Sequence, residues 1–411
     1  MSRIKDESLF PSGEMKIKWV ERNMPVVRGI YEEFARTRPL AGQKIALSVH
    51  LEAKTAYLCL AMAAAGAEMY VTGSNPLSTQ DDVAAALVKA GLHVFAVYGC
   101  NMEEYEENLR EVLRPGPNII IDDGGDLVHL MHTEFTDLIP NVIGGCEETT
   151  TGIHRLRAMD KAGELKFPMV MVNDADCKHM FDNRYGTGQS VWDGILRTTN
   201  LVIAGKYVVV SGYGWCGRGI AMRGKGLGAK IIVTETDPVR ALEAVMDGYE
   251  VMPMEKAASL GDIFVTVTGC SGVIKKEHML SMKDGAIVSN AGHFDVEVDM
   301  AGLREMALEE YEARHNIKGY VLPNGKTIFA IADGRLVNLA AADGHPAEIM
   351  DMSFAIQALS AKFLIDNKDT LRPGVVSVPK EIDIAVARRK LAALNIEIDT
   401  LSDEQIEYLG I

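Results

Sequence analysis

The sequence predicts an α/β protein built from two doubly wound parallel-sheet domains. Three observations lead to this fold class. The chain has 411 residues, which is too long for one ordinary hydrophobic core. Its first part alternates short apolar runs with helix-like segments, and the same alternation starts again near residue 201. A glycine-rich turn, residues 212–217, directly follows an apolar run of the second part.

The first part has the alternation typical of β-α units. Strands are expected at residues 44–49, 68–72, 93–98 and 118–121, and helices at residues 53–65 and 81–90. The last of these strands runs into the polar turn DDGGD, residues 122–126, at what would be the carboxyl end of a parallel sheet. Because ligands bind at such ends, we expect this part of the chain to hold a substrate.

The turn in the second part has the spacing of a dinucleotide fingerprint. Gly212, Gly214 and Gly217 allow a tight turn and a close approach of the backbone to a pyrophosphate, and the following helix start supplies N–H groups. Glu235 lies on the next apolar run, where an acid accepts from ribose hydroxyls and favours NAD over NADP. Strands expected near Tyr207 and Ile231 and at 262–268 and 286–290 complete a Rossmann NAD-binding domain.

The remaining pattern sets the predicted domain boundaries. Residues 347–366 have a helical pattern, residues 372–374 break it, and a charged amphipathic tail runs from residue 380 to residue 411. We expect a substrate-binding domain at 1–187 completed by 346–375, the Rossmann NAD-binding domain at 188–345, and a C-terminal helical tail at 376–411.

Composition limits the classes of partner. Asp and Glu number 57 against 42 Lys and Arg, a net charge of −15, which argues against nucleic acid or an anionic membrane and favours a small-molecule partner. The six cysteines contain no CxxC pair, so we expect neither a zinc site nor a disulfide framework, and we expect a cytoplasmic location. No apolar run is long enough to span a bilayer, so no membrane anchor is expected.

Several polar clusters have an ordinary structural interpretation beside a functional one. His50 after its strand, the DDGGD turn, and the run 147–152 could be a buried histidine, turn chemistry and a helix N-cap. The run 173–183 could be a solvated loop. By topology, the run 290–295 should face a cofactor cleft, so function is favoured there.

Taken together, these segments identify a family resemblance. The chain closely resembles the S-adenosylhomocysteine hydrolases over nearly its whole length. The resemblance depends on the joint occurrence of NPLSTQDD, IIDDGGDL, EETTTGIHR, VNDADCK, FDNRYG, SGYGWCGRG, TETDP, VTGC, GHFDVE, ADGRLVNLA and GHP. It implies that a tightly held NAD oxidises the 3′ carbon of the substrate, which acidifies the 4′ proton so that homocysteine can leave. Water then adds, and the retained NADH returns the hydride, so the net reaction is a reversible hydrolysis to adenosine and homocysteine.

The resemblance also implies roles for individual residues. Catalytic roles fall on His50, Asp123, Lys178, Asp182, Asn183 and His293. Substrate contacts fall on His50, Glu52, Lys54, Thr55, Asp123, Glu148, Lys178, Asp182 and His345. Cofactor contacts fall on Thr149, Thr150, Thr151, Asn183, Gly212, Gly214, Trp215, Cys216, Gly217, Arg218, Gly219, Glu235, Arg240, Ala291, Gly292, His293, Asn338 and His345.

Two roles in that implied mechanism concern proton transfer. Lys178 is expected to take the proton of the 3′ hydroxyl, with its pKa lowered by desolvation. Asp123 and His50 are both candidates for the base that removes the 4′ proton. No metal is expected, apart from a monovalent cation that Gln80 could help to bind.

The sequence departs from the family pattern at two places that matter. Where the family has a glutamate that contacts the 6-amino group of adenine, this chain has Lys54, a donor that suits the 6-oxo group of hypoxanthine. S-inosylhomocysteine is therefore an alternative substrate, and the competing interpretation is that Lys54 pairs with Glu52 while adenine still binds. The C-terminal tail is also shorter than in longer members and lacks their Lys/Tyr segment, although a homo-oligomer, a tetramer, is still expected. Looser NAD binding should follow.

Two other classes of function compete with this interpretation. A plain NAD-dependent dehydrogenase shares the two-domain plan but would accumulate NADH. A non-catalytic regulatory relative would have lost a reacting group, whereas Lys178, Asp182, Asp123, His50 and His293 are all present.

Overall fold

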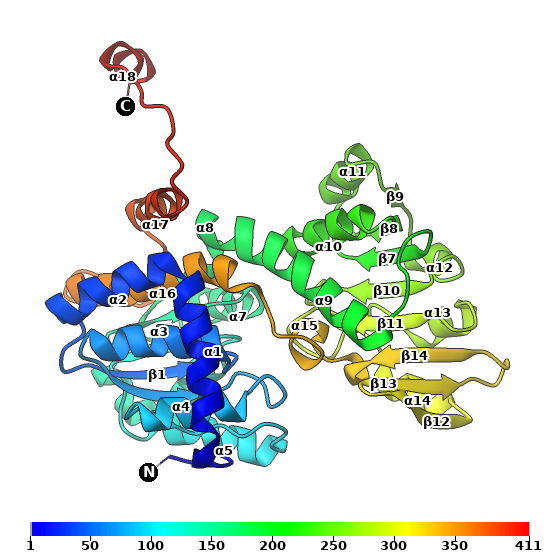
Figure 1. Ribbon diagram of the computed structural model, residues 1–411, viewed down its shortest axis with the longest axis horizontal. Coiled ribbons are helices and arrows are strands. Elements are labelled where there is room, and N and C mark those ends of the chain that lie inside the picture. The colour runs from blue at the N-terminus through cyan, green and yellow to red at the C-terminus, as the bar shows by residue number, and fades with distance from the viewer. Residues whose placement is uncertain (1, 411) are drawn as a thin grey trace.

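Two sheets, each covered by helices on both faces, form the two bodies seen in the computed structural model (Figure 1). The structure describes residues 2–410, so the first residue of the predicted substrate domain and the last residue of the tail lie outside the described residues. No helix among residues 2–410 is long and apolar enough to cross a membrane.

The first sheet is parallel throughout and has seven strands in the order β15-β6-β5-β4-β1-β2-β3. Its strands are β1 (Lys44–Ser48), β2 (Glu68–Thr72), β3 (His93–Val94), β4 (Ile119–Asp122), β5 (Gly144–Glu147), β6 (Pro168–Met171) and β15 (Gly374–Ser377). From β1 the successive strands β2 and β3 are added toward one edge of the sheet, and β4, β5 and β6 are added toward the other edge. The strand order therefore reverses between β1 and β4, which is where an open α/β sheet binds ligands.

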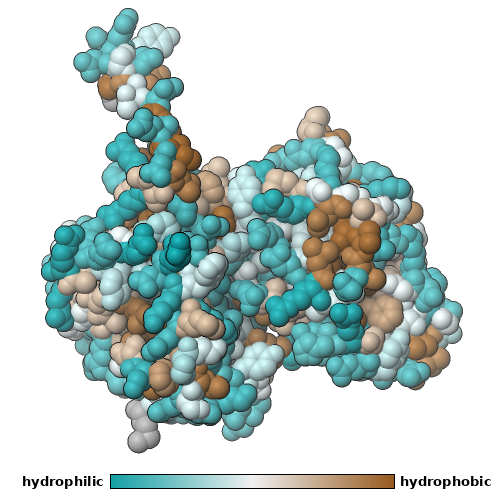
Figure 2. Space-filling view, in the orientation of Figure 1, coloured by the Kyte–Doolittle hydropathy of each residue, from teal (hydrophilic) through white to brown (hydrophobic). Residues whose placement is uncertain are grey.

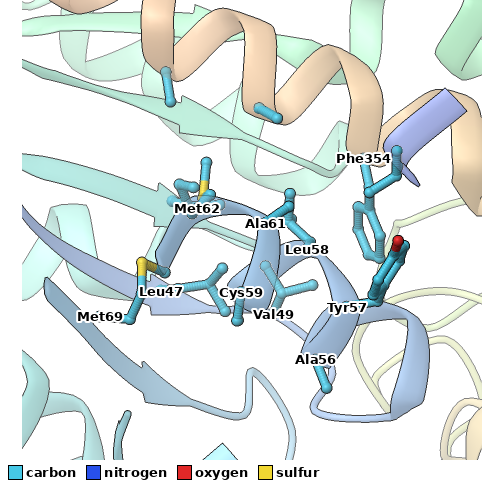
Figure 3. Packing of buried hydrophobic residues seen from close by; sticks show 14 of the residues in the cluster. Leu47, Val49, Ala56, Tyr57, Leu58, Cys59, Ala61, Met62, Met69 and Phe354 are labelled. Atoms are coloured by element: carbon cyan, nitrogen blue, oxygen red, sulfur yellow. The ribbon is translucent and has the colours of Figure 1, made fainter. Parts of the chain in front are cut away.

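Helices cover both faces of this sheet. They are α1 (Phe10–Asn23), α2 (Pro25–Thr37), α3 (Ala53–Ala64), α4 (Asp81–Lys89), α5 (Met102–Leu113), α6 (Asp126–Thr133), α7 (Thr150–Lys161) and α16 (Ala347–Asp366). Alternate residues of β1 separate the two cores, because Leu47 packs among α1–α4 and α16 while Ala46 packs with α5–α7. Figure 3 shows Leu47 and Val49 beside α3, with Phe354 of α16 next to Tyr57.

The second sheet has eight strands in the order β12-β13-β14-β11-β10-β7-β8-β9. They are β7 (Tyr207–Ser211), β8 (Lys230–Thr234), β9 (Glu250–Val251), β10 (Ile263–Thr266), β11 (Ile287–Asn290), β12 (Glu309–Arg314), β13 (Ile317–Val321) and β14 (Thr327–Ile331). Its order reverses between β7 and β10. The predicted parallel, doubly wound fold is confirmed, whereas the antiparallel strands β12 and β13 that extend its edge were not predicted.

Helices of the second unit include the two that carry the chain into and out of it. They are α9 (Thr187–Thr199), α10 (Trp215–Gly226), α11 (Pro238–Met246), α12 (Met254–Ala257), α13 (Lys276–Ser281), α14 (Met300–Met306) and α15 (Val337–Ala340). After α15 the chain returns to the first sheet through α16 (Figure 1). The tail is formed by α17 (Lys380–Ala393), which packs on α2 and α16, and α18 (Asp403–Leu409), which projects away from the body.

Strands β5 and β6 were not predicted. Strand β5 contains Gly144 and Gly145, which the β-propensity of a sequence does not reveal. A side chain at Gly145 would lie 2.6 Å from the carbonyl oxygen of Ile120, so the close approach of β4 explains the glycine. The run 147–152, which could be a simple N-cap, therefore combines the end of a buried strand with the start of α7.

Candidate active site

A single cavity of about 1150 Å³ lies where the two units meet, and the carboxyl ends of strands from both sheets line it. His50 follows β1 and Asp123 follows β4, at the point of reversal in the first sheet. Gly212 follows β7 and Thr268 follows β10, at the corresponding point of the second sheet. In both sheets, the carboxyl ends of the strands, where such sheets usually bind ligands, therefore face one cavity.

At the centre of the cavity Asp123 joins the two units. Its carboxylate accepts a hydrogen bond from Ser74 Oγ at 2.9 Å and lies 3.4 Å from His50 Nε2 and 4.0 Å from His293 Nδ1. His50 Nδ1 lies 2.8 Å from the hydroxyl of Ser78, which fixes the ring. Residues remote in sequence are thereby brought within contact distance.

The pKa values of His50 and Asp123 are both lowered, for different physical reasons. Burial lowers the pKa of His50 to about 4, although Asp123 acts in the opposite direction, so the imidazole is neutral at pH 7. Burial alone would raise the pKa of Asp123, but His50 and His293 hold it below its usual value. The pair therefore offers a carboxylate and a neutral imidazole, both of which can accept a proton.

Lys178 stands at the start of a π-helix, η4 (His179–Gly186), a rare helix form that occurs frequently at functional sites. Its ammonium lies 3.2 Å from Asp182 and 3.6 Å from Glu148, and it donates to Asn183 Oδ1 at 3.0 Å and to Asn173 Oδ1 at 3.2 Å. Burial disfavours the ammonium, but the two carboxylates outweigh it and raise the pKa of Lys178 above its usual value. This corrects the expectation that desolvation lowers the pKa of Lys178, because sequence reasoning left out the two acids.

Asp182 is buried and fully engaged. Asp182 Oδ2 accepts a hydrogen bond from Ser353 Oγ at 2.7 Å and also pairs with Lys178, and Asp182 Oδ1 lies 2.5 Å from His345 Nδ1. Burial raises the pKa of Asp182, but Lys178 and His345 outweigh burial and lower it strongly. Glu148 differs, because burial raises its pKa to about 7 against the opposing effect of Lys178.

The segment that carries Lys178 is held by the C-terminal tail. The carboxylate of Asp383 on α17 accepts the backbone N–H groups of Asp176 and Cys177 at 2.7 and 2.8 Å. These N–H groups open α8 (Asp176–Lys178), whose first turn would otherwise lack partners. The tail thus caps the turn that presents the lysine.

Lys54 lies on the first turn of α3 and lines the cavity. Its ammonium lies 2.6 Å from Glu52 Oε2 and donates to the carbonyl oxygen of Asp343 at 3.0 Å. Glu52 also accepts the N–H groups of Lys54 and Thr55, so it caps the helix. The lysine therefore pairs with Glu52, and one of its three N–H donors remains for a ligand.

The glycine turn has the conformation its sequence predicts. Gly212 has φ 100°, a value that favours glycine, and a side chain at Gly217 would lie 1.9 Å from the Gly212 carbonyl oxygen. A side chain at Gly219 would lie 1.7 Å from the carbonyl oxygen of Arg184, because α10 packs directly on η4. Gly214 and Trp215 line the cavity, whereas Gly217 and Gly219 make close packing possible.

The residues at this end of the cavity fit a dinucleotide. Helices α7 and α10 both begin at the cavity without a side-chain cap, through Thr149 and Gly214, so their N–H groups are available to an anion. Glu235 accepts the N–H of Tyr213 at 2.7 Å, and this bond and two further backbone N–H groups outweigh burial and lower its pKa. The carboxylate is therefore ionised and fixed where ribose hydroxyls would donate to it.

Most of the residues singled out from the sequence line this cavity. Those that do are His50, Glu52, Lys54, Thr55, Asp123, Glu148, Thr149, Thr150, Thr151, Lys178, Asp182, Asn183, Gly212, Gly214, Trp215, Cys216, Glu235, Arg240, Ala291, Gly292, His293, Asn338 and His345. Arg218 stacks on Trp215 and pairs with Glu243 outside it. Gln80 does not line the cavity either, and its side-chain oxygen Oε1 accepts a hydrogen bond from the ammonium of Lys16 at 3.0 Å.

Sequence reasoning missed several lining residues. Asn173 was named only as part of a polar run, yet its Oδ1 atom accepts hydrogen bonds from Lys178 Nζ and Asn183 Nδ2. The His179 ring packs against the Trp215 ring across the two units, with ring centroids 5.1 Å apart and an angle of 35° between the ring planes. Met350 and Phe354 reach the cavity from α16, and a purely apolar helical pattern gave no signal for them.

The fold and the cavity define the class of protein: a two-unit enzyme in which a Rossmann domain presents a dinucleotide to acid, base and lysine side chains held by a second sheet. Comparison with protein families agrees. The family model for the NAD-binding domain of S-adenosyl-L-homocysteine hydrolase matches residues 183–344, and the model for S-adenosyl-L-homocysteine hydrolase matches residues 1–136.

Curated relatives match over the full length. The chain is 57% identical over 409 residues to an S-inosyl-L-homocysteine hydrolase of Methanocaldococcus jannaschii, covering 100% of this chain and 98% of the relative. It is 58% identical over 406 residues to an adenosylhomocysteinase of Thermococcus kodakarensis, covering 99% and 96%. The chain belongs to the S-adenosyl-L-homocysteine hydrolase family; it is a hydrolase, and NAD is its cofactor.

Among solved structures, the chain resembles a dipicolinate synthase from Bacillus halodurans with a TM-score of 0.50. That match is 13% identical and covers 80% of this chain and 99% of the other, so it shows a shared fold alone.

Proposed function

We propose that the protein catalyses the reversible hydrolysis of S-adenosyl-L-homocysteine to adenosine and L-homocysteine. The observation that supports this most is the shared cavity, in which the NAD-binding turn and the Lys178–Asp182 pair are joined by the His50–Asp123–His293 cluster. A plain dehydrogenase needs only the NAD-binding turn and one group that accepts the hydroxyl proton, a role that the Lys178–Asp182 pair could fill. Elimination and water addition also need a second acid-base group, which this cluster supplies.

The glycine turn and Glu235 would hold NAD, which would supply reversible hydride transfer at the 3′ carbon of the ribose. In this proposal Asp182 and Lys178 hold the ribose hydroxyls, and Lys178 receives the 3′ proton. Since Asp182 and Glu148 raise the pKa of Lys178, the lysine must first pass its proton to a neighbour. Glu148, 3.6 Å away with a pKa near 7, is suited to accept it.

The His50–Asp123 pair is proposed to handle the 4′ proton and the leaving thiolate. Asp123 is ionised and His50 is neutral, so the carboxylate can act as base while the imidazole relays the proton. His50 Nε2 and Asp123 Oδ2 are 3.4 Å apart, so the two side chains titrate together and the observed pKa values describe the pair. His293, on the NAD-binding unit, closes the other side of Asp123 and limits water access.

A second substrate, S-inosyl-L-homocysteine, is favoured by one observation. Lys54 has a single N–H donor left after Glu52 and the Asp343 carbonyl are served, and the 6-oxo group of hypoxanthine accepts such a donor. Relatives named for the inosyl and the adenosyl substrates match almost equally, at 57% and 58% identity. Identity therefore does not choose between the two purines.

The test is thiol release from both nucleosidyl homocysteines by the purified protein, with the bound nucleotide identified. We expect release without accumulation of NADH. Lys54→Met should lower kcat/KM for the inosyl substrate by at least about tenfold if the lysine reads the 6-oxo group. An equal loss on both substrates would assign Lys54 to packing, a clear adenosyl preference of the wild type would refute the inosyl alternative, and no thiol release would refute hydrolysis.

We further propose a cytoplasmic homotetramer with domain boundaries at residues 1–187 and 346–375, 188–345 and 376–411. Apolar side chains on the tail support assembly, because Leu394, Ile398 and Leu409 are exposed and Figure 2 shows hydrophobic surface there. The cysteines, all free in the described residues, suit a reducing compartment. Light scattering coupled to gel filtration tests the tetramer, and a monomeric mass would refute it.

A further inference from the structure

Two buried carboxyl groups lie next to the catalytic residues without being used by the proposed mechanism. Asp122 ends β4 and Glu147 ends β5, and the two residues stand opposite each other in the parallel register. Both are 0% exposed. Their chain neighbours Asp123 and Glu148 line the cavity, whereas they do not. Successive side chains of a strand point to opposite faces, so the pair lies behind the site.

The pair holds the backbone of both catalytic loops. Asp122 accepts the N–H of Asp123 at 3.1 Å through one oxygen and the N–H of Val128 at 3.0 Å through the other. Glu147 Oε1 accepts the N–H groups of Gly124 and Thr149, both at 2.9 Å. One carboxyl thus ties the loop after β4 to the loop after β5, where the first NAD-binding threonine lies.

No cation compensates these two acids. Among residues 2–410, no Lys, Arg or His lies within ion-pair distance of Asp122 or Glu147. Arg155, which contacts the loop after β4, pairs with Asp126 at 2.7 Å and donates to the Gly124 carbonyl oxygen. Two adjacent carboxylates in a dry interior cannot both stay charged, so one of them keeps a proton.

The hydrogen bonds show where that proton fits. Both oxygens of Asp122 accept N–H groups, whereas Glu147 Oε2 is buried and has no partner. We propose that Glu147 is a neutral carboxylic acid that shares its Oε2 proton with Asp122, and that this pair positions the loops of Asp123 and Glu148–Thr149. Burial supports the assignment, since it raises the pKa of both groups, that of Asp122 to about 7.

Space around Glu147 is as restricted as its bonding. A side chain at Gly152, in the first turn of α7, would lie 2.1 Å from the Glu147 carboxyl carbon. The carboxyl group therefore packs directly against the helix that starts with the NAD-binding threonines. A change in its shape or charge therefore acts on both loops, because the carboxyl group is hydrogen-bonded to the backbone of each.

Isosteric amides test this inference, which rests on the proposed function. In Glu147→Gln the amide oxygen still accepts both N–H groups, and the NH2 group replaces the acidic proton as donor to Asp122. We expect kcat within about twofold of wild type, unchanged NAD retention, and an unmoved acid limb of the kcat/KM pH profile. In Asp122→Asn an NH2 group must face one of two N–H donors, so loop placement suffers and kcat should fall by about 10- to 100-fold.

The readouts separate this role from a merely structural one. If Glu147 were ionised, Glu147→Gln would remove a negative charge beside Asp123 and shift the acid limb to lower pH; that shift, or a large loss of kcat, would overturn the proposal. If Glu147→Gln does not fold, infrared spectra of the holoenzyme decide at a pH about two units above the pKa of about 7 that Glu148 and Asp122 have. A protonated carboxylic acid band that persists there supports the proposal, and its absence refutes it.

Asp351→Asn is the control for Asp122→Asn, with the difference that Asp351 also pairs with Lys390 at 2.9 Å. Asp351 is a buried aspartate whose two oxygens accept the N–H groups of Val26 and Val27, and it lies outside the cavity. Its amide variant should be less stable with an unchanged pH profile. Wild-type protein without thiol-release activity would refute the proposed function, whereas an active wild type with an altered Glu147→Gln profile would refute only the carboxyl pair.

Discussion

Replacement of Lys178 by methionine is the perturbation that the structure defines most sharply. The ammonium is the only basic group within ion-pair distance of Glu148 in the described residues, and it shares Asp182 with His345. Side-chain exposures are 6% for the lysine, 2% for Asp182 and 7% for Glu148. Lys178→Met therefore leaves uncompensated buried carboxylates, and we expect a loss of about 3–5 kcal/mol in the free energy of unfolding near neutral pH.

The sign of the pH dependence follows from Glu148. Its pKa is raised from 4.5 to about 7 in the folded protein, so the folded state binds the proton more tightly than the unfolded state. Stability from this group is fully present below the unfolded pKa and is lost as pH rises through the folded pKa. Without the lysine the folded pKa rises further, so the penalty of Lys178→Met should grow between about pH 5 and pH 8.

The assay combines chemical denaturation at these two pH values with single-turnover formation of reduced nicotinamide. Turnover of Lys178→Met should fall by about 10²- to 10⁴-fold, the usual range for a lost proton-transfer group. Lys390→Met is the matched control, because Lys390 pairs with the buried Asp351 at 2.9 Å outside the cavity. The control should lose stability and keep turnover. Comparable turnover in the two variants, or a stability penalty that does not grow with pH, would show that Lys178 neither transfers a proton nor compensates Glu148.

Three further predictions concern packing, capping and titration. Gly219→Ala should lower NAD retention, because its new methyl group would meet the Arg184 carbonyl oxygen at 1.7 Å. Gly226→Ala on the same helix has open space and should stabilise the fold by about 0.5–1 kcal/mol. The amount of bound nucleotide and the unfolding midpoint are measured for both variants. Asp383→Ala removes the cap of α8, so it should lower the free energy of unfolding by about 1–2 kcal/mol and lower kcat more than it raises KM. An unchanged kcat in steady-state kinetics would contradict this prediction. His50, with its pKa lowered to about 4, binds fewer protons folded than unfolded, so stability should rise with pH between about 4 and 6.5; His50→Asn should flatten that rise in denaturation curves.

Local patterns in the sequence predicted much of the fold. The strand at Glu68–Thr72 and the helix at Ala347–Asp366 were predicted with the bounds that the structure has, because apolar periodicity and breakers mark them directly. Strand β5 was missed because its glycines serve contacts with β4 and β6, which no local pattern records. Strand β3 ends at Val94, four residues before the predicted end at Tyr98. Phe95 instead forms an isolated β-bridge with Arg3, near the N-terminus.

The candidate site divides in the same way. Residue types such as His50, Asp123 and Glu235 could be singled out because they follow apolar runs, which places them at the carboxyl ends of parallel strands. Asn173 and Phe354 could not, since one lies within a polar run and the other within a buried helix.

The two doubly wound sheets, the NAD-binding turn and the family could be read from the amino-acid sequence, because each depends on residue order over short stretches. The charge states became visible only in the folded chain: the raised pKa of Lys178, the pairing of Lys54 with Glu52, and the buried carboxyl groups of Asp122 and Glu147. The physical reason is that a pKa depends on burial and on through-space distances to charges, and only folding brings those charges together.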